Sequence, residues 1–187
     1  MNTLHNLDAI IRKHRRDNLG KATRELDAFR AMSFDEAVCH AARAERFDPR
    51  RHRWLRYDHQ RRIPRTSLER VRAKLRNAPL KKCSTFDELL SLVHDVTHKI
   101  PKIGELMVYD TALRVGANLG LEPDRVYLHA GTRVGARKLG FGAGTPSIHR
   151  RDLPEPLKVL PAWQVEDILC IFKDWLGGQI GRPGRCA

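Results

Sequence analysis

Three side chains in the second half of the chain, Asp110, Tyr127 and His129, are of types that can take part in proton transfer. A histidine can act as a general base or as an electrostatic partner near neutral pH. Asp110 lies within a helical pattern, where we interpret a carboxylate first as solvated.

The segment Ile100–Gly104 reads IPKIG and separates two helical patterns. Pro101 ends the first pattern, because a residue before proline disfavours the α conformation. We expect Gly104 to supply the unusual torsion of a short turn. The free amides at the start of the second helix can then bind an anion. The segment predicts a phosphate contact made by Lys99, Lys102, Ile103 and Gly104; a packing turn between two core helices is the alternative.

A second basic segment runs from Phe47 to Arg65 and carries seven arginines against two aspartates. Aromatic residues are interleaved with the arginines, a pattern that suits stacking on bases beside phosphate contacts. The predicted nucleic-acid contacts are Arg53, Trp54, Arg56, Tyr57, Arg61 and Arg62. The alternative is a solvated basic loop that Trp54 anchors to the core.

Beyond the turn, the chain continues with Val126-Tyr127-Leu128-His129 and then Arg137-Lys138-Leu139-Gly140. With Ile100–Gly104, these motifs resemble the helix-hairpin-helix DNA glycosylase superfamily, the endonuclease III-like group, over about residues 86–140. The resemblance implies an all-α fold with a central helix-hairpin-helix motif. It also implies double-stranded DNA, damaged or modified, as the partner. Arg133 and Arg137, on the helix after the hairpin, are then further candidate contacts.

The chain departs from that family at both catalytic positions. The lysine nucleophile of its bifunctional members corresponds to Leu106, and the catalytic aspartate corresponds to Tyr127 or His129. We therefore expect a divergent glycosylase-like protein that binds the DNA backbone. One alternative that the resemblance implies is an active base-excision or modified-base-processing enzyme, a hydrolase or lyase acting on a flipped base. Its candidate catalytic residues are His129, Tyr127 and Asp110, one of which would replace the missing aspartate. The other is an RNA-binding or protein-bridging adaptor.

Charge, length and cysteine content limit the predicted fold and partner. The chain has 187 residues and a formal net charge of +13, which favours a polyanionic partner. Its length suits a single helical domain, 1–187, or a compact bilobal one. We expect no membrane partner, a cytoplasmic location (nucleoid-associated if bacterial) and a role in DNA repair. Four scattered cysteines predict reduced thiols, and we expect neither a metal nor a cofactor. The sequence leaves the oligomeric state open.

Local signals place most of the helices. Ser33–Glu36 and Thr85–Glu88 have the spacing of capping boxes. An apolar face at helical spacing follows Pro161 and predicts a final buried helix. The glycine- and proline-rich stretch after Gly140 predicts an irregular loop, and about 178–187 predicts a frayed tail.

Overall fold

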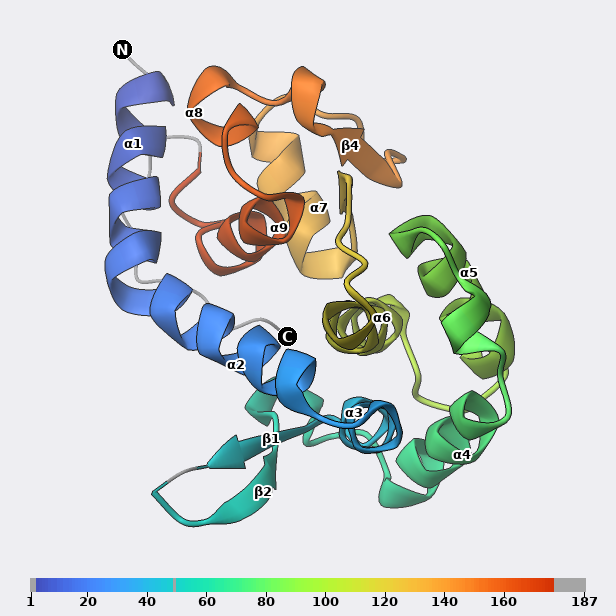
Figure 1. Cartoon of the computed structure of the whole chain (residues 1–187). Coiled ribbons are helices and arrows are strands. Elements are labelled where there is room, and N and C mark those ends of the chain that lie inside the picture. The colour runs from blue at the N-terminus through green and yellow to red at the C-terminus, as the bar shows by residue number, and fades with distance from the viewer. Residues whose placement is uncertain (1–2, 49, 177–187) are drawn as a thin grey trace. The chain divides into compact units, whose positions relative to one another are not determined.

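A computed structural model describes residues 3–48 and 50–176 of the chain (Figure 1). The expected frayed tail lies outside these residues. The described chain is mostly helical, as expected. It is not all-α, however, because it also contains two small antiparallel sheets. The chain divides into a central unit, 24–122, and a terminal unit formed by 1–23 and 123–187.

The elements follow one another along the chain. The α-helices are α1 (Thr3–His14), α2 (Gly20–Ala31), α3 (Phe34–Ala42), α4 (Arg65–Arg76), α5 (Phe86–Thr97), α6 (Glu105–Leu119), α7 (Ala130–Lys138), α8 (Glu155–Lys158) and α9 (Ala162–Ile171). The strands are β1 (Glu45–Asp48), β2 (Arg53–Arg56), β3 (Arg125–Tyr127) and β4 (Ser147–His149). A π-helical segment, Arg15–Leu19, joins α1 to α2, and 3-10 turns occupy Asp58–Gln60, Leu80–Lys82 and Arg150–Asp152.

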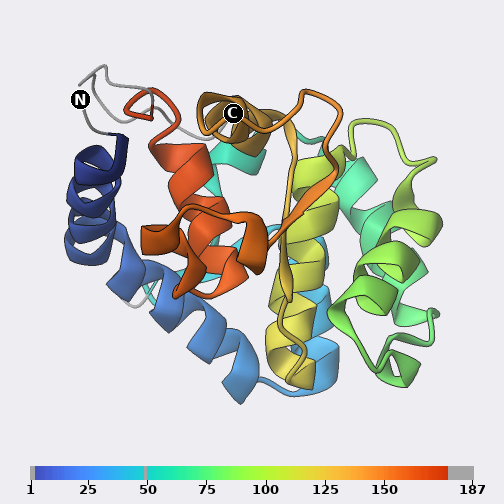
Figure 2. The same ribbon diagram turned by 90° about the horizontal axis from the view of Figure 1, so that it is seen from above.

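In the central unit, α6 packs against both α3 and α5, and α3 packs against α4. Figure 2 shows α6 lying alongside α5. The buried face of α6 includes Ala112 and Val115, which are fully buried. The central unit is therefore a helical assembly built around α6.

Of the two expected capping boxes in the central unit, the first forms in full and the second forms in part. The Ser33 hydroxyl accepts from the Glu36 backbone N–H, and the Glu36 carboxylate accepts from the Ser33 N–H. Thr85 Oγ1 accepts from Glu88 N–H, but the Glu88 carboxylate accepts from the Ser84 N–H instead of that of Thr85. These contacts depend on residues within one helical turn, which is why the sequence predicts them.

In the terminal unit, α9 packs against α7 and also contacts α1 and β3. The expected irregular loop after Gly140 contains β4, which pairs with β3 so that Val126 lies opposite Ile148. Both of these side chains are buried in the core of the unit, together with Ile168 and Leu169 of α9. The final helix therefore supplies much of this core, as its apolar face predicts.

None of the described helices is both long enough and apolar enough to cross a bilayer.

Candidate nucleic-acid interface

The basic segment after Phe47 is not a loop but begins with a β-hairpin in the central unit. β1 and β2 pair antiparallel, with Phe47 opposite Trp54. The hairpin tip is ordered by Asp48, whose Oδ1 accepts from the backbone N–H groups of Arg50 and Arg51 at 3.0 and 3.3 Å. This carboxylate is thus engaged within the tip, and its side chain is only 17% exposed.

The two aromatic residues predicted to stack on bases anchor the hairpin instead. The Trp54 ring stacks on His40 of α3, with ring centroids 3.3 Å apart and an interplanar angle of 8°. The His40 Nδ1 also lies 3.0 Å from the Glu45 carboxylate. Tyr57 is buried beneath the Arg114 guanidinium, which lies 3.9 Å from its ring centroid. The prediction that Tyr57 contacts nucleic acid is therefore wrong. The half-buried Trp54 ring anchors the hairpin to α3, as the alternative prediction for this residue has it.

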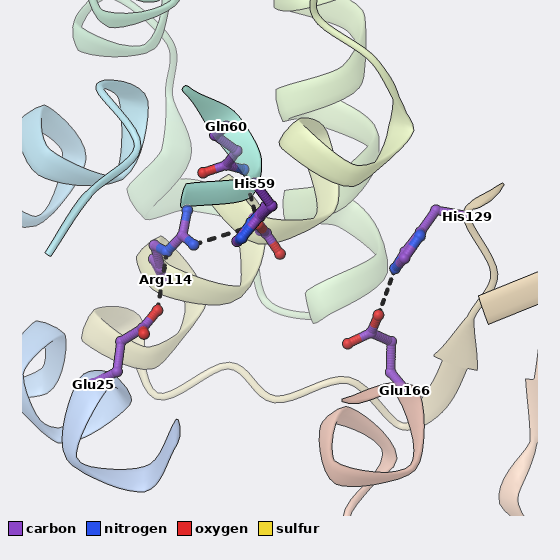
Figure 3. Close-up of polar contacts among 7 residues, drawn as sticks. Glu25, His59, Gln60, Arg114, His129 and Glu166 are labelled. Atoms are coloured by element: carbon purple, nitrogen blue, oxygen red, sulfur yellow. Dashed lines mark hydrogen bonds and ion pairs between the residues drawn. The ribbon is translucent and has the colours of Figure 1, made fainter. Parts of the chain in front are cut away.

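Below the hairpin, α6 contributes a buried charge network (Figure 3). Arg114 is 4% exposed and bonds to Asp110 and Glu25 at 3.3 and 3.4 Å. Asp110 Oδ2 also accepts from His59 at 2.9 Å and from Gln60 at 2.8 Å. The interpretation of Asp110 as a solvated helix residue is therefore wrong. Its carboxylate holds the segment after β2 onto α6.

The same burial fixes the protonation state of Tyr57. Burial raises the pKa of its phenol, whereas the nearby Arg114 charge lowers it, and the net shift is upward. The tyrosine is therefore neutral at any physiological pH. It contributes its ring face to the cation above it.

In the turn between α5 and α6, the unusual backbone torsion occurs at a different residue from the one expected. Lys102 has the left-handed conformation, with φ of 66°, whereas Gly104 is extended, with φ of −105° and ψ of 176°. Gly104 is the N-cap of α6 and supplies no side-chain cap. The first helical hydrogen bond runs from the Val108 N–H to the Gly104 carbonyl, so the preceding amides have no acceptor within the helix. This is the geometry that an anion can cap.

We therefore expect Gly104→Ala to change the free energy of unfolding by less than about 0.5 kcal/mol. An added Cβ would meet no atom within 4 Å, and the backbone there is extended. The matched comparison is Gly120→Ala at the C-cap of α6, where φ is 72° and we expect a loss of about 1 kcal/mol. Urea unfolding of the two variants measures the difference; equal losses at both positions would contradict the assigned torsions.

The turn and the basic segment meet at a small apolar cluster of the central unit. Ile103 from the turn and Ile63 from the basic segment both pack, half-buried, against the buried residues Ala44, Tyr57, Leu68 and Met107. Ile103 thus has a packing role in the structure, and its contact with nucleic acid stays a prediction. Because Ile103 directly follows Lys102, and Ile63 directly follows Arg62, the cluster brings the two predicted basic regions together.

The cations that flank this cluster are largely free to bind an anion. Lys99, Lys102 and Arg62 are exposed, and none has an ion-pair partner within the described part of the chain. Arg61 pairs with Asp58 at 2.7 Å, but both side chains are 69% exposed, so water competes with the pair. Arg56 differs, because its Nη1 donates to the Ile63 carbonyl and supports the segment from within. Among residues 3–48 and 50–176, the other exposed arginines of this region are Arg50, Arg51, Arg53 and Arg65.

The remaining predicted residues belong to the terminal unit. His129 is 3% exposed, and its Nε2 donates to Glu166 of α9 at 2.5 Å (Figure 3). The His129 backbone N–H also donates to Thr132 Oγ1 at 2.7 Å. Tyr127, on β3, is half-buried. The structure thus pairs His129 with Glu166, 37 residues further along, which no spacing in the sequence indicates.

That pair defines a fixed imidazole rather than an exposed base. Thr132 holds the His129 backbone at the start of α7, and the Glu166 carboxylate orients the ring. Arg133 is half-buried and Arg137 exposed on the same helix. These two arginines lie in the terminal unit, whereas Asp110 and the α5–α6 turn lie in the central unit. The stretch that resembles the glycosylase core therefore divides between the units at Glu122 and Pro123.

A third potential ligand lies beside the His129–Glu166 pair. Donor atoms of His129, Glu166 and Cys170 are all within 4.8 Å of one another and buried. Cys170 is disulfide-bonded, however, so the expectation of a reduced thiol is wrong for this residue. A disulfide sulfur is not the thiolate that binds a metal ion, which leaves two donors at this position.

Comparison of the chain with known protein families, with curated proteins and with solved structures found no match in any of the three.

Proposed function

We propose that the protein binds the phosphate backbone of duplex DNA through the α5–α6 turn, acting as a helix-hairpin-helix element, together with the neighbouring basic segment. The packing of Ile63 against the same cluster as Ile103 carries this proposal. It brings residues 61–63 and the turn to the same cluster, and the first amides of α6 have no acceptor within the helix itself. Amides and cations side by side suit an anion better than either alone.

The charge of the whole chain supports the same partner. A net charge of +13 attracts a polyanion over a long range, and each phosphate that is neutralised releases a counterion. The turn has one opposing charge, because Glu105 is exposed in the first turn of α6. The exposed Glu105 carboxylate repels a phosphate bound at this helix start, and water screens that repulsion, so Glu105 weakens the contact.

We expect the double variant Lys102→Glu/Arg61→Glu to bind a labelled DNA duplex about 100-fold more weakly, from roughly tenfold for each charge-assisted contact. The slope of log K against log salt should fall in magnitude by about 2, because two phosphate contacts are lost. Fluorescence anisotropy over a series of salt concentrations measures both quantities. The same titration on duplex RNA tests the choice of partner, and tighter binding to RNA would overturn it.

The matched control reverses the charge of one arginine and one lysine elsewhere in the central unit. Arg76 is the last residue of α4, about 16 Å along the helix from Arg65, and Lys82 follows the helix; both are exposed. Arg76→Glu/Lys82→Glu alters the net charge equally, so it reports the general electrostatic effect alone. Equal losses of affinity in the two double variants would remove the turn from the interface.

A further inference from the structure

One large apolar side chain on the hairpin is exposed without a packing role that explains it. Phe47 is 45% exposed, and Val159 of the terminal unit is the other exposed large apolar residue within the described part of the chain. The Phe47 ring meets Trp54 edge-on, with centroids 5.7 Å apart and planes at 63°. Since Trp54 is itself stacked on His40, Phe47 contacts an anchored aromatic pair while 45% of its surface stays exposed to solvent.

Arginines border this exposed ring. Arg50, Arg51 and Arg53 follow Phe47 around the hairpin tip, and all three are exposed. Asp48 accepts the tip amides and lies 3.9 Å from Arg51 Nε, which leaves Arg50 and Arg53 without a carboxylate partner in the described residues. An aromatic ring surrounded by unpaired cations matches a base attached to a phosphate chain.

We propose that Phe47 stacks on an unpaired base of DNA while the arginines of the hairpin tip bind the phosphates beside it. This inference rests on the proposed function, since the turn and the basic segment would hold the adjoining duplex. Phe47 keeps an exposed aromatic surface for a ligand. A base at a gap is already unpaired, so it can stack on this ring without the cost of opening a base-pair step.

The test compares a perfect duplex with the same duplex carrying a short single-stranded gap that contains 2-aminopurine. We expect the native protein to bind the gapped DNA about 5- to 20-fold more tightly, the range for stacking on one partly exposed ring. It should also quench the 2-aminopurine fluorescence. Phe47→Ala should lose the preference and the quenching but keep the affinity for the perfect duplex.

Conservative variants separate stacking from folding. Phe47→Trp retains an aromatic face and should retain the preference, whereas Phe47→Leu retains apolar bulk and should lose it. The matched control is Val159→Ala, which removes the other exposed apolar side chain and should change nothing. If Phe47→Ala does not fold, as judged by circular dichroism, the Trp and Leu variants decide the question.

The outcomes also distinguish this inference from the proposed function. Salt-dependent binding to the perfect duplex without a preference for the gap refutes the stacking contact alone. So does a preference that Phe47→Leu preserves. Absence of salt-dependent binding to either DNA refutes the proposed function and this inference with it.

Discussion

Replacing Arg114 by methionine should lower the free energy of unfolding by about 3–5 kcal/mol, the cost of removing one partner from a buried ion pair. The guanidinium is 4% exposed and lies between the carboxylates of Asp110 and Glu25, with the Tyr57 ring against it. Methionine fills a similar volume but leaves two poorly solvated negative charges without their shared cation. The segment after β2 should loosen as well, because Asp110 would no longer be held for His59 and Gln60.

Arg30 provides a matched control for this substitution. It also contacts two carboxylates of the central unit, Asp27 at 2.7 Å and Glu122 at 2.9 Å, but it is 39% exposed. Arg30→Met should therefore cost less than about 1 kcal/mol, as exposed ion pairs usually do. Urea unfolding gives the two values, and hydrogen exchange should show faster exchange around residues 57–60 in Arg114→Met only. Similar losses for the two variants would mean that the Arg114 network is not buried in solution.

Introducing a single methyl group at Gly135 should destabilise the terminal unit by about 3 kcal/mol or more. A Cβ at this position would overlap the backbone carbonyl oxygen of Leu169, where α7 crosses α9. In a helix, alanine is more favourable than glycine by about 1 kcal/mol, so this substitution at an exposed helical glycine would stabilise the protein. Here the steric overlap should outweigh the gain in helix propensity, because a backbone carbonyl cannot rotate away as a side chain can. The two helices must then separate.

Gly142→Ala is the control in the same unit, since its Cβ would meet Thr145 Oγ1 at an ordinary contact distance of 3.6 Å. We expect a change below about 0.5 kcal/mol there. Thermal unfolding and hydrogen exchange of α7 and α9 report the loss in Gly135→Ala. A variant as stable as the native protein, or more stable, would show that helix propensity dominates and that α7 and α9 are not in close contact.

In the candidate interface, the sequence predicted the basic segments but not the exposure of their side chains. The arginine-rich segment and the IPKIG turn are both visible in the sequence, but which of their residues face solvent is not. Trp54 and Tyr57 are aromatic residues among arginines, a pattern typical of nucleic-acid contacts, yet each has a partner from a distant helix, His40 and Arg114. Phe47 is the aromatic residue of this segment that stays exposed, which its position in the sequence does not indicate.

What the sequence determined by itself was local or summed over the chain. Capping at Ser33 and Thr85, the apolar face of α9 and the positive charge follow from neighbouring residues or from composition. The tertiary structure alone decided the contacts between distant residues. It packed Ile63 and Ile103 against the same cluster, bonded Asp110 to His59 and paired His129 with Glu166. The physical reason is range, because a helix start depends on side chains within one turn, whereas burial and charge pairing depend on segments that folding alone brings together.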